Sequence, residues 1–233
     1  MKADEFKQNT ARRGFLGTLI KGATALSLMS FASPFKLNAS SEPESKAPGD
    51  PDLWFNQIKG KHKMVFDVTQ PHEVFPFAWP RVFLVTNGFT GTPEKENSVV
   101  VVLRHTAIPY AFEDRLWSKY SFGEIFKADD PKTKTASIRN PFWKPEVGDF
   151  KIPGVGNVQI GINELQESGV MFCVCDMAMT VFSNIIGGKM NMDPAEVKKD
   201  WMTGLLPGIQ VVPSGVWAVG RAQEHGCSYC FAG

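Results

Sequence analysis

The chain has 233 residues, with 25 basic and 24 acidic side chains that give a formal charge of +1 at neutral pH. Hydrophobic residues make up 43% of it, enough to bury the core of one ordinary domain. The near-zero charge provides no basic field for nucleic acid, so we expect no nucleic-acid partner.

The N-terminal segment has the layout of an export signal. Adjacent Arg12 and Arg13 precede a mildly apolar stretch that runs to Phe31 and small residues near Ala32. This stretch contains Lys21 and is too short and too weakly apolar for a membrane-spanning helix. The segment "TARRGFLG" resembles the twin-arginine translocation signal of bacteria, which implies contact with the twin-arginine export machinery and a periplasmic location. The alternative is a basic amphipathic helix.

We expect the signal peptide to span residues 1–32. Its removal takes away five basic and two acidic residues, leaving 20 and 22 and a formal charge of −2. Residues 33–60 are rich in Ser, Pro and acids and are expected to form a flexible tether before a domain at residues 61–233. Export implies an oxidising compartment, in which exposed thiols pair or are kept reduced by dedicated partners.

Short apolar runs alternate with helix signals along this domain. The expected strands, in chain order, are Lys63–Val68, Ser98–Leu103, Val170–Cys175, Gly208–Pro213 and Cys227–Ala232. The continuous β-branched run "SVVVVL" is typical of a parallel strand that is buried on both faces.

The helix signals depend on prolines, caps and glycines. The first expected helix has Pro80 in its first turn and ends near Gly88. The second starts at Pro109 and carries Leu116. The third places Val158, Ile162 and Leu165 on one face and ends before Gly169. Three more helices are expected to begin at a capping residue. They run from Asp176 to just before Gly187, from Asp193 to Gly204, and from Ser214 to Gly226. The alternation predicts an α/β fold with an open, mostly parallel sheet of about five strands and helices on both faces.

One segment breaks the alternation. Residues 121–156 contain four prolines, mixed charges and little periodicity, which predicts a long irregular insertion. It is interpreted as a lid over a site, an arm that holds a neighbouring subunit, or a variable loop.

Three residues with chemical potential follow parallel strands directly. His105, Cys175 and Ser214 each stand at or just after a strand end, where ligands and reactive groups gather in such sheets. Cys175 precedes the expected cap Asp176, so its thiol faces a helix N-terminus that lowers a cysteine's pKa, whereas the Asp176 charge opposes the effect. Ser214 and Gly215 form a cap and turn, or an anion-binding nest.

The other cysteines are interpreted differently. Cys173 shares a strand face with Cys175 and is expected to be a buried small hydrophobe, although two inert core cysteines are the alternative reading for the pair. Cys227 and Cys230 lie three apart on a strand, so they are expected on opposite sides and to be structural, or else to form a disulfide. The histidines show no zinc-ligand spacing.

The C-terminal half resembles the DsrE/DsrF-like proteins. The resemblance rests on "GVMFCVCDMAM" and "LLPGIQVVPSGVWAVGRAQEHGCSYC", with "KMVFDV" and "VVVVLRHTAI" fitting the first two strands. It implies a flavodoxin-like domain that commonly forms trimers or hexamers, and some members carry sulfur as a persulfide. Cys175 matches the family's cysteine, whereas nothing matches Cys173, Cys227 or Cys230. Sulfur-relay members are cytoplasmic, whereas this chain carries an export signal.

Three functional hypotheses follow. In the first, Cys175 carries sulfane sulfur, His105 assists as a base or ion-pair partner, and a sulfur-donor or redox protein is the partner. In the second, the chain is a non-catalytic oligomeric module that binds a small ligand or a partner in the strand-end crevice, with aromatic residues such as Trp117 beside it. The third is a metal-binding protein that uses Cys175, His105 and Cys173. No cofactor is expected, because the sequence lacks a phosphate-binding loop for a nucleotide. Serine hydrolase chemistry is not expected either, because a nucleophile elbow is missing from the sequence.

Overall fold

A computed structural model of the chain describes residues 51–233. The expected signal peptide and most of the expected tether lie outside the described residues. The described part belongs to one unit, Lys46–Gly233. No helix within it is long and apolar enough to cross a membrane.

The fold is built on an open sheet of five parallel strands. The strand order is β6-β5-β2-β1-β7, with β1 at Lys63–Val68, β2 at Ser98–Leu103, β5 at Val170–Cys175, β6 at Ile209–Val212 and β7 at Ser228–Phe231. The predicted α/β, flavodoxin-like open sheet is therefore confirmed. β2 is central and buried along its whole length, as its β-branched run requires.

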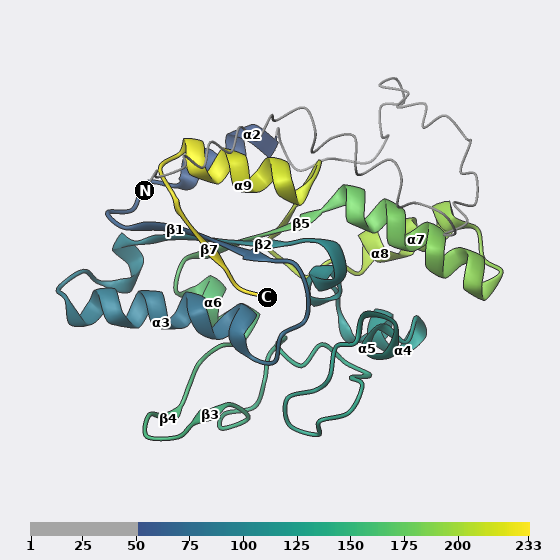
Figure 1. Cartoon of the computed structure of the whole chain (residues 1–233), viewed down its shortest axis with the longest axis horizontal. Coiled ribbons are helices and arrows are strands. Elements are labelled where there is room, and N and C mark those ends of the chain that lie inside the picture. The colour runs from purple at the N-terminus through teal and green to yellow at the C-terminus, as the bar shows by residue number, and fades with distance from the viewer. Residues whose placement is uncertain (1–50) are drawn as a thin grey trace, which may run out of the picture. The chain divides into compact units, whose positions relative to one another are not determined.

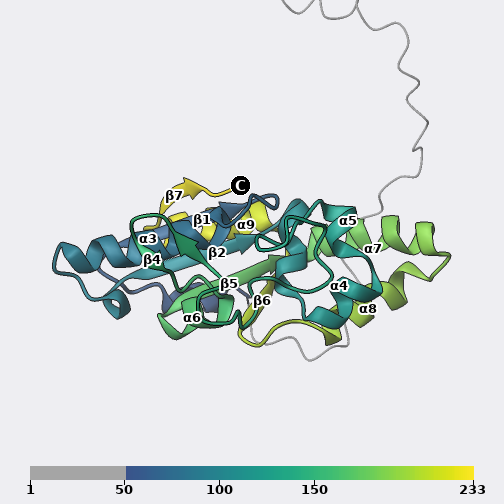
Figure 2. The ribbon, with the colours of Figure 1, turned by 90° about the horizontal axis from the view of Figure 1, so that it is seen from below.

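Helices cover both faces of this sheet (Figures 1 and 2). One face carries α9, Gly215–Glu224, together with α2, Pro51–Trp54, and η1, Phe55–Gln57. The opposite face carries α3, Phe75–Phe89, and α6, Ile162–Glu167. Phe55 and Ile58 are buried beneath α9, so the folded domain begins before residue 61, where the sequence reading had placed the end of the tether.

Most of the remaining elements lie beyond the carboxyl end of the strands or along the α3 face (Figure 1), whereas the 3₁₀ turn Glu94–Glu96 directly precedes β2 at its amino end. The remaining elements are η2 Glu94–Glu96, η3 His105–Ala111, α4 Asp114–Lys119, α5 Phe122–Phe126, β3 Lys151–Ile152, β4 Gly156–Asn157, α7 Asp176–Met190 and α8 Pro194–Thr203. α8 has the predicted caps, because the Asp193 carboxylate accepts from the Ala195 amide at 2.9 Å and the helix stops before Gly204. Asp200 joins α8 to α4 by accepting from Arg115, Lys119 and Tyr120.

Several predicted helix boundaries were wrong. α6 begins only at Ile162, so Val158, which was expected on the same helix face, lies before the helix. α3 begins at Phe75, so Pro80 lies inside the helix, and α4 begins only at Asp114, because Pro109 belongs to the preceding 3₁₀ turn. α7 continues through Gly187 to Met190. A Cβ on Gly187 would lie 2.9 Å from the Met192 carbonyl oxygen, so this glycine permits close packing toward α8 and does not end the helix.

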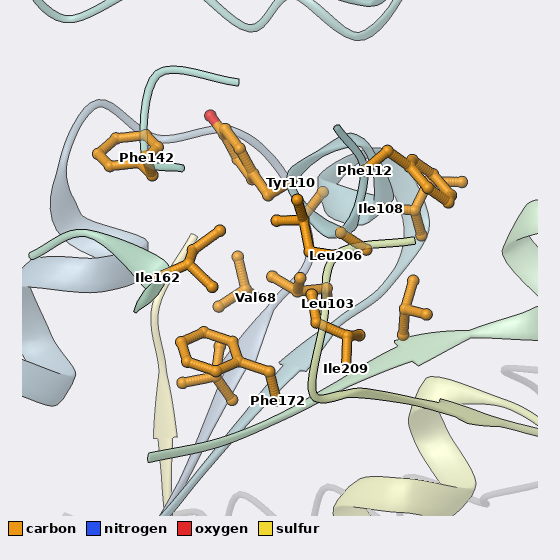
Figure 3. Close-up of a cluster of buried hydrophobic side chains, with 14 of the residues drawn as sticks. Val68, Leu103, Ile108, Tyr110, Phe112, Phe142, Ile162, Phe172, Leu206 and Ile209 are labelled. Carbon is orange, nitrogen blue, oxygen red and sulfur yellow. The ribbon is translucent and has the colours of Figure 1, made fainter. Parts of the chain in front are cut away.

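The segment 121–156 is folded, not irregular. It contains α5 and the β3–β4 hairpin, and its Phe142 ring packs 4.3 Å from Phe77 and 5.4 Å from Tyr110 between centroids. Figure 3 shows Phe142 and Tyr110 within the buried cluster of the α3 face. The buried Asn140 amide donates to the Tyr110 and Phe112 carbonyls at 3.0 and 2.9 Å. These contacts make the segment part of the core.

Candidate functional site

A groove of about 480 Å³ opens at the carboxyl end of the sheet. It is lined by Arg104 and His105 after β2, Cys175 at the end of β5, and Ser214 after β6. Its wall is apolar and comes from α7 and the start of α9. The structure thus brings His105, Cys175, Ser214 and Gly215 to one site, as expected for residues that follow neighbouring parallel strands.

Cys175 is the N-cap of the 15-residue helix α7. Its Sγ accepts a hydrogen bond from the Ala178 amide at 3.2 Å, and the residue is 6% exposed. Asp176, which the sequence reading had placed at the cap, occupies the first helical turn. Its carboxylate pairs with Lys198 of α8 at 2.7 Å, so a cation offsets the charge expected to oppose a thiolate. A helix N-terminus with a donated amide bond favours negative charge on the sulfur.

The four cysteines are all free thiols, and their surroundings differ. Cys173 is fully buried in the cluster beneath α9, and burial raises its pKa well above the ordinary value. Cys175 belongs to the cluster on the opposite face of the sheet, because the chain leaves the strand there to begin α7. The prediction that Cys173 and Cys175 share a face was therefore wrong. Cys227 and Cys230 pack toward opposite faces as predicted, and burial raises the pKa of Cys227 to about 11.

His105 is exposed at the first position of η3, with a left-handed backbone at φ 50°. Its ring contacts the Phe182 ring of α7 edge-on, with centroids 5.9 Å apart. A non-glycine residue in this conformation is uncommon and needs support from its surroundings. The turn carries the imidazole to the side of the groove formed by α7.

A buried ion pair stands behind the groove. Asp67, 2% exposed near the end of β1, accepts from Arg104 Nε at 2.6 Å and Nη2 at 2.8 Å, and from the Tyr229 hydroxyl at 2.9 Å. The hydrogen bond with Asp67 raises the pKa of Arg104. Arg104 is therefore a fixed cation that lines the same groove as Cys175.

Ser214 and Gly215 start α9. The Ser214 hydroxyl accepts from the Trp217 amide at 3.2 Å, which makes it the predicted cap. Gly215 packs directly on Arg104, because a Cβ there would lie 2.5 Å from Arg104 Cβ. Asp67 and Gly215 together fix the Arg104 side chain from two sides.

Trp117 does not reach the groove. It is fully buried among the residues of η3, α4 and α5, and its Nε1 donates to the Pro109 and Phe112 carbonyls at 3.1 and 3.3 Å. Its place is in the core, so the aromatic contribution to the groove comes from Phe182.

Sequence reasoning missed Arg104, Asp67 and Tyr229. Asp67 carried a usable signal, since a charged residue inside the apolar run "KMVFDV" implies a buried partner. The apolar side chains of α7 were not assigned to the site. In residues 51–233, no three His, Cys, Asp or Glu side chains are grouped so that they could hold a metal ion.

No family model matches the chain, and no curated protein is similar to it. One solved structure with similarity is that of a protein of unknown function from Methanobacterium thermoautotrophicum. It is 19% identical with a TM-score of 0.38, and the alignment covers 73% of this chain and 99% of that one.

Proposed function

We propose that this chain is an exported, DsrE-like thiol protein that carries sulfane sulfur on Cys175. The observation that carries the proposal is the position of its Sγ, which accepts the Ala178 amide at the start of α7 and borders an open groove. A sulfur carrier needs a nucleophilic thiolate and access for a donor, and it needs neither metal nor nucleotide.

The neighbouring groups support this chemistry. His105 lines the same groove and serves as the base that accepts the thiol proton. Arg104 supplies a positive charge near the sulfur, which favours the thiolate and the persulfide anion that replaces it. Export through the twin-arginine route and assembly into a homo-oligomer belong to the same proposal and rest on the sequence resemblance.

The proposal is tested by intact-mass measurement of the full chain. The reduced protein is incubated with a sulfane-sulfur donor, alongside Cys175→Ser and, as the matched control, Cys230→Ser, because Cys230 is the most exposed of the four thiols. We expect a gain of one sulfur atom that reducing agent reverses, that is lost in Cys175→Ser and that persists in Cys230→Ser. A gain that persists in Cys175→Ser contradicts the proposal, and no gain at all favours the binding-module hypothesis.

A further inference from the structure

The groove is lined mainly by apolar side chains of α7 and the start of α9, with Arg104, His105 and Cys175 beside them. A molecule that fills the groove and reaches Cys175 needs a polar, sulfur-bearing head and an apolar body. This requirement restricts the donors that can deliver sulfur to Cys175.

Arg104 offers hydrogen-bond donors to an anion. Nε and one N–H of Nη2 are engaged by Asp67, and Nη1 has no hydrogen-bond partner among residues 51–233. The side chain is 27% exposed and lines the groove. A guanidinium held in this way by a buried carboxylate presents its free edge in a fixed direction, which suits oxyanion oxygens.

The apolar wall follows one face of α7. Met177, Val181 and Ile185 stand four residues apart, so they lie on one stripe of the helix, and each is 43–45% exposed. Val216 at the start of α9 adds a 70% exposed side chain to the same groove. Partly exposed apolar side chains beside a fixed cation match an amphipathic anion better than a small inorganic one.

We propose that the groove accepts organic thiosulfonates, amphipathic anions that bear sulfane sulfur, as sulfur donors to Cys175; this inference rests on the proposed carrier function. The sulfonyl oxygens accept hydrogen bonds from the free edge of Arg104, and the organic group lies along Val181 and its neighbours. The terminal sulfur then reaches the Cys175 Sγ at the helix N-terminus.

The transfer balances without an oxidant. The Cys175 thiol first gives its proton to His105, and the thiolate attacks the terminal sulfur of the donor. A new Sγ–S bond forms while the bond between that sulfur and the sulfonyl sulfur breaks. The electron pair of the broken bond leaves with the organic group as a sulfinate anion, and Cys175 retains a persulfide.

The test compares benzenethiosulfonate with inorganic thiosulfate on the full chain. The second-order rate of sulfur addition is measured by intact mass for each donor and is divided by the rate of that donor with free cysteine, which removes intrinsic reactivity. Because the ring buries apolar surface on the wall, we expect the normalised rate of benzenethiosulfonate to exceed that of thiosulfate about tenfold.

Two variants on α7 separate the wall from the rest of the helix. Val181→Asn removes the apolar contact without a change of charge and is expected to abolish the preference. Met190→Asn is the matched control, since Met190 is similarly exposed on α7 but does not line the groove. An equal effect of the two substitutions would overturn the role of the wall.

Arg104→Gln tests the cation and is expected to lower the rates of both anionic donors about tenfold more than it lowers the rate at which neutral methyl methanethiosulfonate labels Cys175, because the neutral reagent senses only the loss of thiolate. Arg104→Gln leaves the buried Asp67 carboxylate without its partner and so affects folding. A second test of the cation therefore uses the wild-type protein. Its Cys175 should react faster with an anionic than with a cationic methanethiosulfonate, after normalisation to free cysteine. If benzenethiosulfonate and thiosulfate add sulfur at equal normalised rates, the preference for thiosulfonates is overturned and the carrier function stands. If neither donor adds sulfur, the carrier function itself is overturned.

Discussion

The contact between Gly215 and Arg104 gives a prediction whose sign is set by the structure. A Cβ at Gly215 would lie 2.5 Å from Arg104 Cβ, 2.6 Å from Cδ and 3.1 Å from Cγ. Real Cβ atoms do not approach carbon this closely, and the Arg104 Cβ is fixed to the backbone at the end of β2. The side chain must therefore shift, and the shift strains its bidentate contact with Asp67.

Gly215→Ala combines two opposing effects. Overpacking costs about 1–3 kcal/mol, whereas replacing a helical glycine by alanine returns at most about 1 kcal/mol. The expected net change is a loss of about 1–2 kcal/mol in the free energy of unfolding, since Gly215 is the first helical residue and gains little propensity.

Gly220→Ala in the same helix is the matched control. A Cβ there meets no atom within 4 Å, so only the propensity gain remains, and we expect stabilisation of up to about 1 kcal/mol. Urea unfolding of both variants, followed by circular dichroism, measures the difference. If Gly215→Ala is as stable as Gly220→Ala, the tight packing of Arg104 between Asp67 and α9 is refuted.

Three further outcomes are expected. Asp67→Asn should lower the free energy of unfolding by about 2–4 kcal/mol, because it leaves Arg104 without its carboxylate in a largely buried site, and an unchanged urea midpoint would contradict this. Burial opposes ionisation of Asp200, but hydrogen bonds from neighbouring donors outweigh it and hold its pKa at about 2, below the ordinary 3.8. Its stabilisation is thus present above about pH 4 and lost toward pH 2, so Asp200→Asn should cost about 1 kcal/mol at pH 6 and nothing at pH 2, whereas a pH-independent difference between the two unfolding midpoints would contradict it. Iodoacetamide labelling read by peptide mass spectrometry should modify Cys175 in the folded protein and Cys173 only in denaturant, and early labelling of Cys173 would contradict its burial.

The strands were predictable because their signal is local. A continuous β-branched run such as Ser98–Leu103 suits a strand buried on both faces, and the structure places it at the centre of the sheet. Caps were equally local at Asp193 and Ser214, whose side chains bond the amides of the first turn. The meeting of His105 and Cys175 followed from parallel pairing alone.

The errors arose where tertiary packing overrides a local rule. Gly187 resembles a helix stop, yet its missing Cβ lets α7 pack closely against the segment that leads to α8. The prolines of residues 121–156 suggested an irregular loop, but Phe142 and Asn140 fix that segment into the core. Arg104 was passed over because its role depends on Asp67, which lies 37 residues away in sequence.

The location of the transferred sulfur tests the central claim most directly. After the reduced full chain has reacted with a sulfane-sulfur donor, fragmentation mass spectrometry of the peptide that contains both Cys173 and Cys175 assigns the added atom. The account predicts one additional sulfur on Cys175 and none on Cys173. Sulfur found on another cysteine, or a peptide that remains unmodified, would contradict it.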